Sequence, residues 1–475
     1  DMVIALSGQI EDLNGKLDLL TEKINVLTNN EFGRQSETRS ALDDILGPLF
    51  NEAEVIVSEA TPEELAEPSM SDINEKSPKE RRPHPKGKRD DMLKAIPRTE
   101  INHELTGNDL VCQCGGNFTP IGKERTQRLV MHPAYFELED HYIWSYKCGS
   151  CGRIVRSDGP LTIFNGSLAT PSLLAGIATG KFVNAMPFDR IEKSFADCDV
   201  TITRQTMARW MIRVAEDYFS IIYDRMKEEL LKNNIIHADE TTVVVSKDGR
   251  KAGAKSYMWV YTDHNSDYPV VIYEYQKTRA AKHPKEFLEG FKGWLCCDGY
   301  EAYHSLSNDI TVCGCWTHAR RHFVNAAKAL KDLPNRSGEL AVSEKALKLI
   351  AEMFHLDDSW SGLEYQERLE LRNTELKDSM EQYFDWIESV RDSVPPKSET
   401  GKGITYSINQ KKYLLGLLSN PDVPLDNSEA ERKIRNFVIS RKNFVLIDTI
   451  AGAEASAIMF SMSETLKANG LKAHE

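Results

Sequence analysis

Two aspartates and one glutamate, far apart in the chain, are the residues whose surroundings best suit catalytic chemistry. Asp239 and Asp298 each end a short apolar run, residues 235–238 and 294–297, and Glu431 lies in a later polar segment. Carboxylates are hard oxygen ligands of the kind that suits Mg²⁺ or Mn²⁺. We therefore predict that Asp239, Asp298 and Glu431 converge to hold two divalent metal ions.

The elements that would position these acids follow from the apolar pattern. A short apolar run is typical of a buried strand, and a carboxylate at its end lies where a sheet opens to solvent. Residues 256–261 and 270–275 are two further strand-like runs, residues 284–291 are helical, and 310–315 form a later strand. Three strands, a helix and a fourth strand, with aspartate on the first and fourth, is the opening order of a ribonuclease-H-like sheet.

A helix is predicted to carry the third acid. Asp426 stands at its start with Glu429 three residues later, which is the spacing of a capping box. That assignment leaves Glu431 as the acid of this segment that could bind a metal ion. The alternative role of Glu431 is an ion pair with Arg435, one turn further along. Residues 338–394 are acidic and strongly helical, and predict a helical insertion between the second and third acids.

The cysteines indicate a second kind of metal site. Nine cysteines in a long chain without a secretion signal favour a reduced protein over a disulfide framework. Four of them form two glycine-backed pairs that predict a tetrahedral structural zinc site, namely Cys112, Cys114, Cys148 and Cys151. The alternative is a set of free thiols on a small β domain with a hairpin in residues 119–147. Cys315 and His318 show only two ligands, so we favour a packing or orienting role over a second zinc site.

The charge distribution is compatible with nucleic-acid binding. The net charge is -13, but residues 1–78 hold 17 acidic and 5 basic side chains, so the rest of the chain is close to neutral. The acidity therefore does not argue against DNA contact elsewhere. A basic run at 79–89 is either a phosphate-binding arm or a solvated linker. A heptad pattern precedes it and predicts a coiled coil for self-association, through Val3, Leu6, Ile10, Leu13, Leu17, Leu20, Ile24 and Leu27.

Residues 170–217 predict three helices in the manner of a helix-turn-helix reader. The third of these helices begins near Thr203 and presents Arg204, Gln205 and Arg209. Trihelical units also occur as plain packing, so DNA contact is one of two interpretations here. Four further basic residues near the acids are candidate phosphate contacts or ordinary surface charges, namely Arg320, Arg321, Arg441 and Lys442.

Several of these segments together resemble the bacterial insertion-sequence-sixty-six transposases. The likeness is carried by residues 237–241, 298–300, 315–323, 426–432 and 440–444, and extends to the N-terminal heptads, the cysteine pairs and the helical region. The resemblance implies a DDE transposase that binds the terminal inverted repeats of its element, cleaves DNA with Mg²⁺ or Mn²⁺ and joins the ends to target DNA. By motif position its triad falls on Asp239, Asp298 and Glu431. Ser428 and Thr242 depart from the family pattern, but no acid is replaced.

Two other functions share some of these features. A ribonuclease-H-like nuclease without strand transfer would use the same acids, and a non-catalytic zinc and helix-turn-helix regulator would use only the binding regions. We expect a homo-oligomer, with accessory proteins of the same element as possible partners. Without a long apolar run or a signal-peptide pattern, we expect no membrane contact and a cytoplasmic, nucleoid-associated bacterial protein.

These predictions combine into a multidomain α+β protein. Its parts in chain order are a coiled coil (1–50), an acidic then basic linker (51–100), a zinc-binding β domain (101–165), a helical DNA-binding region (166–232), the first part of a ribonuclease-H-like core (233–330), a helical insertion (331–410) and the last part of the core with the catalytic helix (411–475).

Overall fold

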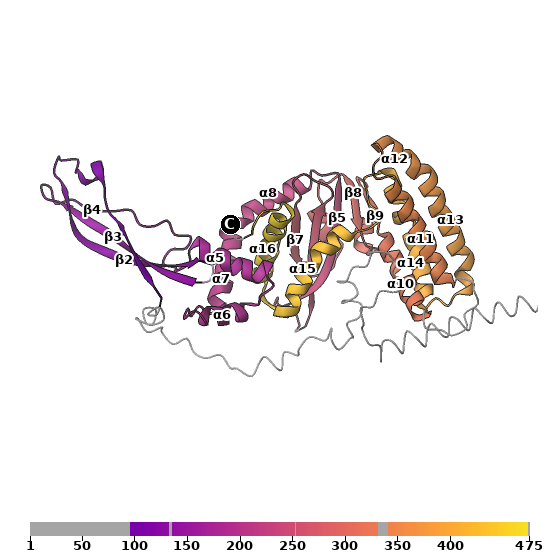
Figure 1. Ribbon diagram of the computed structural model, residues 1–475, viewed down its shortest axis with the longest axis horizontal. Helices are drawn as coiled ribbons and strands as arrows, with labels where there is room; N and C mark the ends of the chain where they lie inside the picture. The colour runs from indigo at the N-terminus through magenta and orange to yellow at the C-terminus, as the bar shows by residue number, and fades with distance from the viewer. Residues whose placement is uncertain (1–95, 133–134, 252, 331–340, 474–475) are drawn as a thin grey trace, which may run out of the picture.

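The computed structural model describes residues 96–132, 135–251, 253–330 and 341–473. Figure 1 shows four groups of elements in a row: an extended β ribbon, a cluster of short helices, a central sheet and a bundle of long helices. The fold is therefore a mixed, multidomain α/β arrangement, as predicted. The predicted coiled coil and almost all of the predicted linker lie outside the described residues.

The central sheet has the strand order β7-β6-β5-β8-β9. The strand β6 pairs antiparallel with both β5 and β7, whereas β8 is parallel to β5 and β9 is parallel to β8. The helix α9 (Lys282–Phe287) lies between β7 and β8 in the chain. This succession confirms the predicted strands and helix, with bounds β5 (Ile235–Lys247), β6 (Lys255–Asp263), β7 (Val271–Gln276), β8 (Gly293–Cys297) and β9 (Ile310–Gly314).

Alternation along the strands divides the sheet into two apolar faces. Met258 and Val260 of β6 face one core, to which the helices α15 (Ser428–Phe444) and α16 (Ile450–Ala468) contribute. Trp259 and Tyr261 face the other, which holds residues of α9 and of the turn η4 (Glu301–Ser305). The short strand β10 (Ile447–Thr449) lies between α15 and α16 and extends the sheet by pairing with the end of β5.

The short helices form one continuous core with the first sheet face. Apolar residues of this helical region, such as Phe195 and Met207, are buried in the same cluster as Val260 of β6 and Phe460 of α16. Helical segments occur where the sequence predicted them, with bounds α5 (Pro171–Ala178), η2 (Thr179–Val183), α6 (Phe188–Ala196), α7 (Arg204–Val214), η3 (Ala215–Phe219) and α8 (Ser220–Leu230).

The long helices between β9 and α15 form a second core. Its centre includes Trp316 and Phe323 of α10 with Tyr383 and Phe384 of α13. The predicted helical character of this segment is confirmed, with bounds α10 (Trp316–Leu330), α11 (Val342–Ser359), α12 (Tyr365–Leu371), η5 (Arg372–Leu376), α13 (Lys377–Val390), η6 (Arg391–Ser393), α14 (Glu399–Leu414) and η7 (Gly416–Ser419). None of the described helices combines the length and apolarity needed to cross a membrane.

The β ribbon is built on one long hairpin. The strand β2 (Phe118–His132) pairs antiparallel with β3 (Tyr135–Cys148) over their whole lengths, so the hairpin predicted in residues 119–147 is present with one further residue at each end. The strand β1 (Arg98–His103) adds parallel to β3, β4 (Ile154–Arg156) adds antiparallel, and the turn η1 (Gly107–Leu110) precedes the first cysteine pair. Leu129 and Leu138 anchor the base of the hairpin in the helical core.

Candidate active site and cysteine cluster

Asp239 and Asp298 lie where the pairing between β5 and β8 stops. The strand β8 pairs with only residues 235–237 of β5, and Asp298 follows the last residue of β8. The sequence prediction that β5 ends at Asp239 was wrong, because β5 continues to Lys247 along β6 and β10. Asp239 thus lies, partly exposed, just beyond the point where its neighbour β8 ends, while β5 runs on.

The helix that carries Glu431 is attached to β5 at its first turn by Asn427. The Asn427 side-chain amide donates to the carbonyl oxygen of Ala238 at 2.8 Å, and its Oδ1 lies 2.9 Å from Nδ1 of His237. Asn427 is fully buried. The start of α15 is thereby held beside the residues that immediately precede Asp239.

This attachment explains why the predicted capping box is absent. The helix starts at Ser428 with Asn427 at the N-cap position, one residue later than predicted. Asp426 still supplies an acceptor, because its Oδ1 receives the Ser428 backbone N–H at 3.0 Å. Glu429 bonds to Arg432 instead of returning to the cap.

The far end of the same helix is attached to β5 by Arg441. Its guanidinium donates to Oγ1 of Thr242 at 2.9 Å, to Oγ1 of Thr241 at 3.3 Å and to the backbone carbonyl of Thr242. The structure therefore does not favour the predicted phosphate contact for Arg441, since this side chain is committed to the strand. Between the two attachments Glu431 is buried, with 3% of its surface exposed.

The three acids influence one another electrostatically. Burial raises the pKa of Asp239 well above its ordinary value, and the carboxylates of Glu240, Asp298 and Glu431 raise it further, while His318 lowers it. Several negative charges thus share one poorly solvated place. Among the described residues, however, the three acids are not one of the groups whose ligand atoms all lie within 4.8 Å of one another.

Glu240, Arg279 and Tyr303 form a network that sequence reasoning missed. Side chains of neighbouring strand residues point to opposite faces, so Glu240 points away from the side of Asp239. There Glu240 accepts from Nε of Arg279 at 2.7 Å and from the hydroxyl of Tyr303 at 2.6 Å. Burial and the charge of Asp298 raise the pKa of Glu240 to about 7 although Arg279 opposes the shift. Arg279 also lies 3.8 Å from Asp298 and stacks on the ring of Tyr300.

Cys315 and His318 meet Glu431 on the opposite side. Cys315 lies between β9 and α10, His318 lies in the first turn of α10, and the ligand atoms of these three residues all lie within 4.8 Å of one another. The Nδ1 atom of His318 is 3.4 Å from Oε1 of Glu431. Burial disfavours a charge on His318, but Cys315 and Glu431 nevertheless raise its pKa well above the ordinary value.

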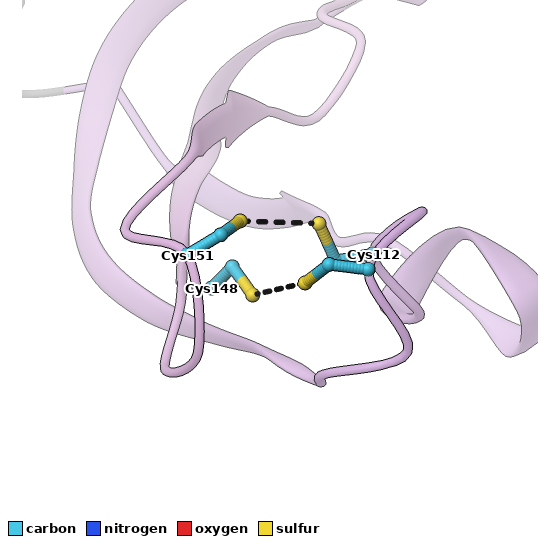
Figure 2. A group of neighbouring side chains, drawn as sticks. Cys112, Cys148 and Cys151 are labelled. Atoms are coloured by element: carbon cyan, nitrogen blue, oxygen red, sulfur yellow. Dashed lines mark hydrogen bonds between the residues drawn. The ribbon is translucent and has the colours of Figure 1, made fainter.

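The four paired cysteines form a second group at the far end of the hairpin. Figure 2 shows two pairs of sulfur atoms facing one another. The Sγ atoms of Cys112 and Cys151 lie 3.6 Å apart, and those of Cys114 and Cys148 lie 3.5 Å apart. These distances exclude disulfides, and a tetrahedral zinc ion with bonds of about 2.3 Å would separate its sulfur ligands by about 3.8 Å. Backbone amides of Cys151 and Ser150 lower the pKa of Cys148 to about 6, against the effect of burial. The cluster is therefore suited to a metal ion.

Two glycines allow this close approach. Gly115 adopts φ +83°, a conformation that side-chain-bearing residues rarely adopt, and its N–H donates to the carbonyl of Cys112 at 2.8 Å. A Cβ on Gly116 would lie 2.5 Å from Oγ of Ser150 and 3.1 Å from Sγ of Cys148. The one-residue spacing of the first pair, which made its signal weak, thus still permits all four sulfurs to meet.

The other predicted DNA-binding residues fall into two groups. Arg204, Gln205 and Arg209 are exposed on α7, and Lys442 is exposed near the end of α15. Arg320, in contrast, is buried, with only 4% of its surface exposed. Arg321 is half-buried, and the charge of Glu431 acts on it, so it lies near that acid.

A comparison with protein families adds independent evidence. The family described as Transposase IS66 family matches residues 166–455, which is more than half of the chain. The chain belongs to the IS66 transposase family. The matched region runs from the loop before α5 into the second turn of α16, so it includes the three acids together with Cys315 and His318. It excludes the four-cysteine cluster.

Three similar proteins come from Sinorhizobium fredii (strain NBRC 101917 / NGR234), and all bear the name uncharacterized protein. One, y4qI, is 27% identical over 99% of this chain and 86% of its own length. Another, y4hP, is 25% identical over 94% of this chain and 82% of its own length. The third, y4jD, is 25% identical over 80% of this chain and 75% of its own length. The likeness to these proteins thus extends beyond the IS66 family region.

Proposed function

We propose that this IS66 family member is a DNA transposase with a ribonuclease-H-like core, in which Asp239, Asp298 and Glu431 form a catalytic triad. The supporting observation is that acids at the end of β8 and on α15 act electrostatically on Asp239 of β5, because the charges of Asp298 and Glu431 both contribute to the shift of its pKa. The strand order β7-β6-β5-β8-β9, with only β6 antiparallel to its neighbours, is the arrangement expected of that core. Its reaction would be cleavage at the element's ends followed by transfer of the freed ends to target DNA.

The residues present fit two hard divalent metal ions. The acids offer only oxygen ligands, which suit Mg²⁺ or Mn²⁺. Burial first, and then the carboxylates of Glu240, Asp298 and Glu431, raise the pKa of Asp239, so cations bound there would neutralise closely spaced negative charge. Ligands of two ions about 4 Å apart span more space than the ligands of one ion. Three acids that hold two ions therefore need not have all their ligand atoms within 4.8 Å of one another. Such ions, when bound, activate the attacking oxygen and stabilise the leaving oxygen of a phosphodiester.

The chain's own residues would position these ligands. Asn427 and Arg441 hold α15 against β5 and so keep Glu431 beside Asp239. Arg279 holds Glu240 and lies near Asp298, with its side chain 38% exposed, so it can meet a DNA phosphate from the open side. We assign Arg279 this contact in preference to Arg320, which is buried, and Arg441, which is bonded to β5.

The remaining parts would bind DNA and organise the assembly. We propose that the four cysteines hold a structural zinc ion, and that α7 reads the element's ends through Arg204, Gln205 and Arg209. Lys442 and Arg321 remain candidate phosphate contacts of the core. The predicted domain limits, the homo-oligomer, the accessory partners and the cytoplasmic, nucleoid-associated location belong to this same proposal.

The direct test is incubation of the full chain with labelled element ends and Mg²⁺, with cut and joined products resolved separately. Asp239→Asn should abolish cleavage while retaining end binding. The matched control is Asp448→Asn, because Asp448 lies on β10, which pairs with the same strand, but is exposed and paired with Lys247. Equal cleavage by the Asp239→Asn variant and the wild type would refute the triad.

The same products separate the alternatives. A nuclease without strand transfer would yield cut DNA and no joined DNA. A non-catalytic regulator would bind ends and yield neither product. The intact acids at all three positions favour an enzyme over the regulator.

A further inference from the structure

The group of Cys315, His318 and Glu431 has donors unlike those of the three acids. A thiol, an imidazole and a carboxylate, with ligand atoms all within 4.8 Å of one another, meet at the junction of β9, α10 and α15. The His318 and Glu431 donor atoms are 3.4 Å apart. A tetrahedral ion with nitrogen and oxygen ligands at about 2.0–2.1 Å separates those ligands by about 3.3 Å. These two donors therefore already have the spacing that one shared ion requires.

The local chain geometry directs the sulfur to the same point. Cys315 and His318 are three residues apart at the start of α10, a spacing that places two side chains on one side of a helix. The backbone N–H of Asn427 donates to Sγ of Cys315 at 3.2 Å, which stabilises the negative charge that a thiolate ligand carries. The side chain of His318 is 15% exposed and gives an ion a path from solvent.

We propose that Cys315, His318 and Glu431 form a binding site for a borderline-soft transition metal ion of the Zn²⁺ type. Thiolate and imidazole ligands select such an ion over Mg²⁺, which prefers oxygen. The sequence showed only two ligands here, and α15 supplies the third. The fourth position of a tetrahedron is left for water or substrate.

Glu431 would belong to this site and to the catalytic one. A zinc ion held by Cys315 and His318 draws the Glu431 carboxylate away from the hard metal ions, so Zn²⁺ inhibits the Mg²⁺-supported reaction. This consequence rests on the proposed function, whereas the binding of the ion does not. Zinc inhibition would then arise because Zn²⁺ and the hard metal ions compete for the Glu431 carboxylate.

The binding test uses Co²⁺ as the probe, added to full-length protein whose four-cysteine site already holds zinc. Wild type should bind one further equivalent with a thiolate-to-cobalt charge-transfer absorption. Cys315→Ala should lose that absorption, and Glu431→Gln should weaken the binding by at least roughly tenfold, since even outer partners of a metal contribute about 10–100-fold. The matched control is Cys313→Ala, a buried cysteine two residues earlier on β9, which should retain the absorption.

The activity test compares zinc inhibition of Mg²⁺-supported cleavage, with each protein measured relative to its own rate without zinc. Cys315→Ala should require at least about tenfold more zinc for half-inhibition than wild type, whereas Cys313→Ala should behave like wild type. An equal cobalt absorption in wild type and Cys315→Ala would overturn the site. A cobalt absorption specific to Cys315, in a protein that never cleaves DNA, would support the site and count only against the proposed transposase function.

Discussion

The replacement of Asn427 by alanine is the sharpest test of how the third acid is positioned. The change removes two buried side-chain hydrogen bonds and leaves the carbonyl oxygen of Ala238 and Nδ1 of His237 without this partner. A buried polar group left unsatisfied costs about 1–3 kcal/mol. We therefore expect Asn427→Ala to lower the free energy of unfolding by about 2–6 kcal/mol.

The effect on activity should exceed the effect of partial unfolding. Asn427 is the last residue before the helix of Glu431, and a displacement of about 1 Å at a catalytic group costs about 100-fold in rate. We expect at least about a tenfold lower rate of end cleavage at a temperature where circular dichroism shows the variant to be folded.

Asn436→Ala is the matched control for this experiment. Asn436 lies on the same helix, but its side-chain amide donates to Glu464 of α16 at 2.7 Å. That bond joins α15 to α16 and not to β5. Unfolding by urea gives the stability of both variants, and cleavage of labelled ends gives their rates. Wild-type cleavage by folded Asn427→Ala, or an equal loss of cleavage in Asn436→Ala, would refute the positioning role.

Three further outcomes are expected elsewhere in the molecule. Burial raises the pKa of Glu274 to about 7, so ionisation of this side chain destabilises the fold progressively as the pH rises from 4.5 to 7. The free energy of unfolding of Glu274→Gln, measured with urea, should therefore exceed that of the wild type by up to about 3 kcal/mol at pH 8 and by little at pH 4. Gly116→Ala places a Cβ against Ser150 and should lower the zinc content and the thermal midpoint, whereas unchanged zinc in a metal assay would contradict the tight packing. Arg372→Ala leaves Asp357 without its ion-pair partner and should cost about 3–5 kcal/mol; a loss below about 1 kcal/mol in the same unfolding assay would show that water replaces the guanidinium.

The elements that carry the acids could be predicted because their signals are local. Apolar runs ending at Asp239 and Asp298 indicated two strands of the sheet. The two cysteine pairs likewise indicated one cluster. In each case the residues next to it in the sequence were enough to indicate the element or the pair to which a residue belongs.

The contacts that position the acids could not be predicted because they join distant segments. Nothing near Asn427 indicates that its amide bonds to β5, 189 residues earlier, and that bond is the reason why it does not cap its own helix. The point at which β5 loses its neighbour, just before Asp239, depends on the length of β8, which lies elsewhere in the chain. Glu431 as third ligand to Cys315 and His318 also required the packing of α10 against α15 to be known.

The length of the β ribbon has a mechanical consequence. From Leu129, which is anchored in the helical core, to Phe118 beside the cysteine cluster the strand β2 covers eleven residues, or about 36 Å. Figure 1 shows this ribbon reaching away from the rest of the molecule. A tilt of about 10° at its base would sweep the tip through roughly 6 Å, nearly two base-pair steps of duplex DNA. A metal ion at the tip, by holding the two strands together there, would let the ribbon swing as a stiff lever and transmit a contact at its end to the helices at its base.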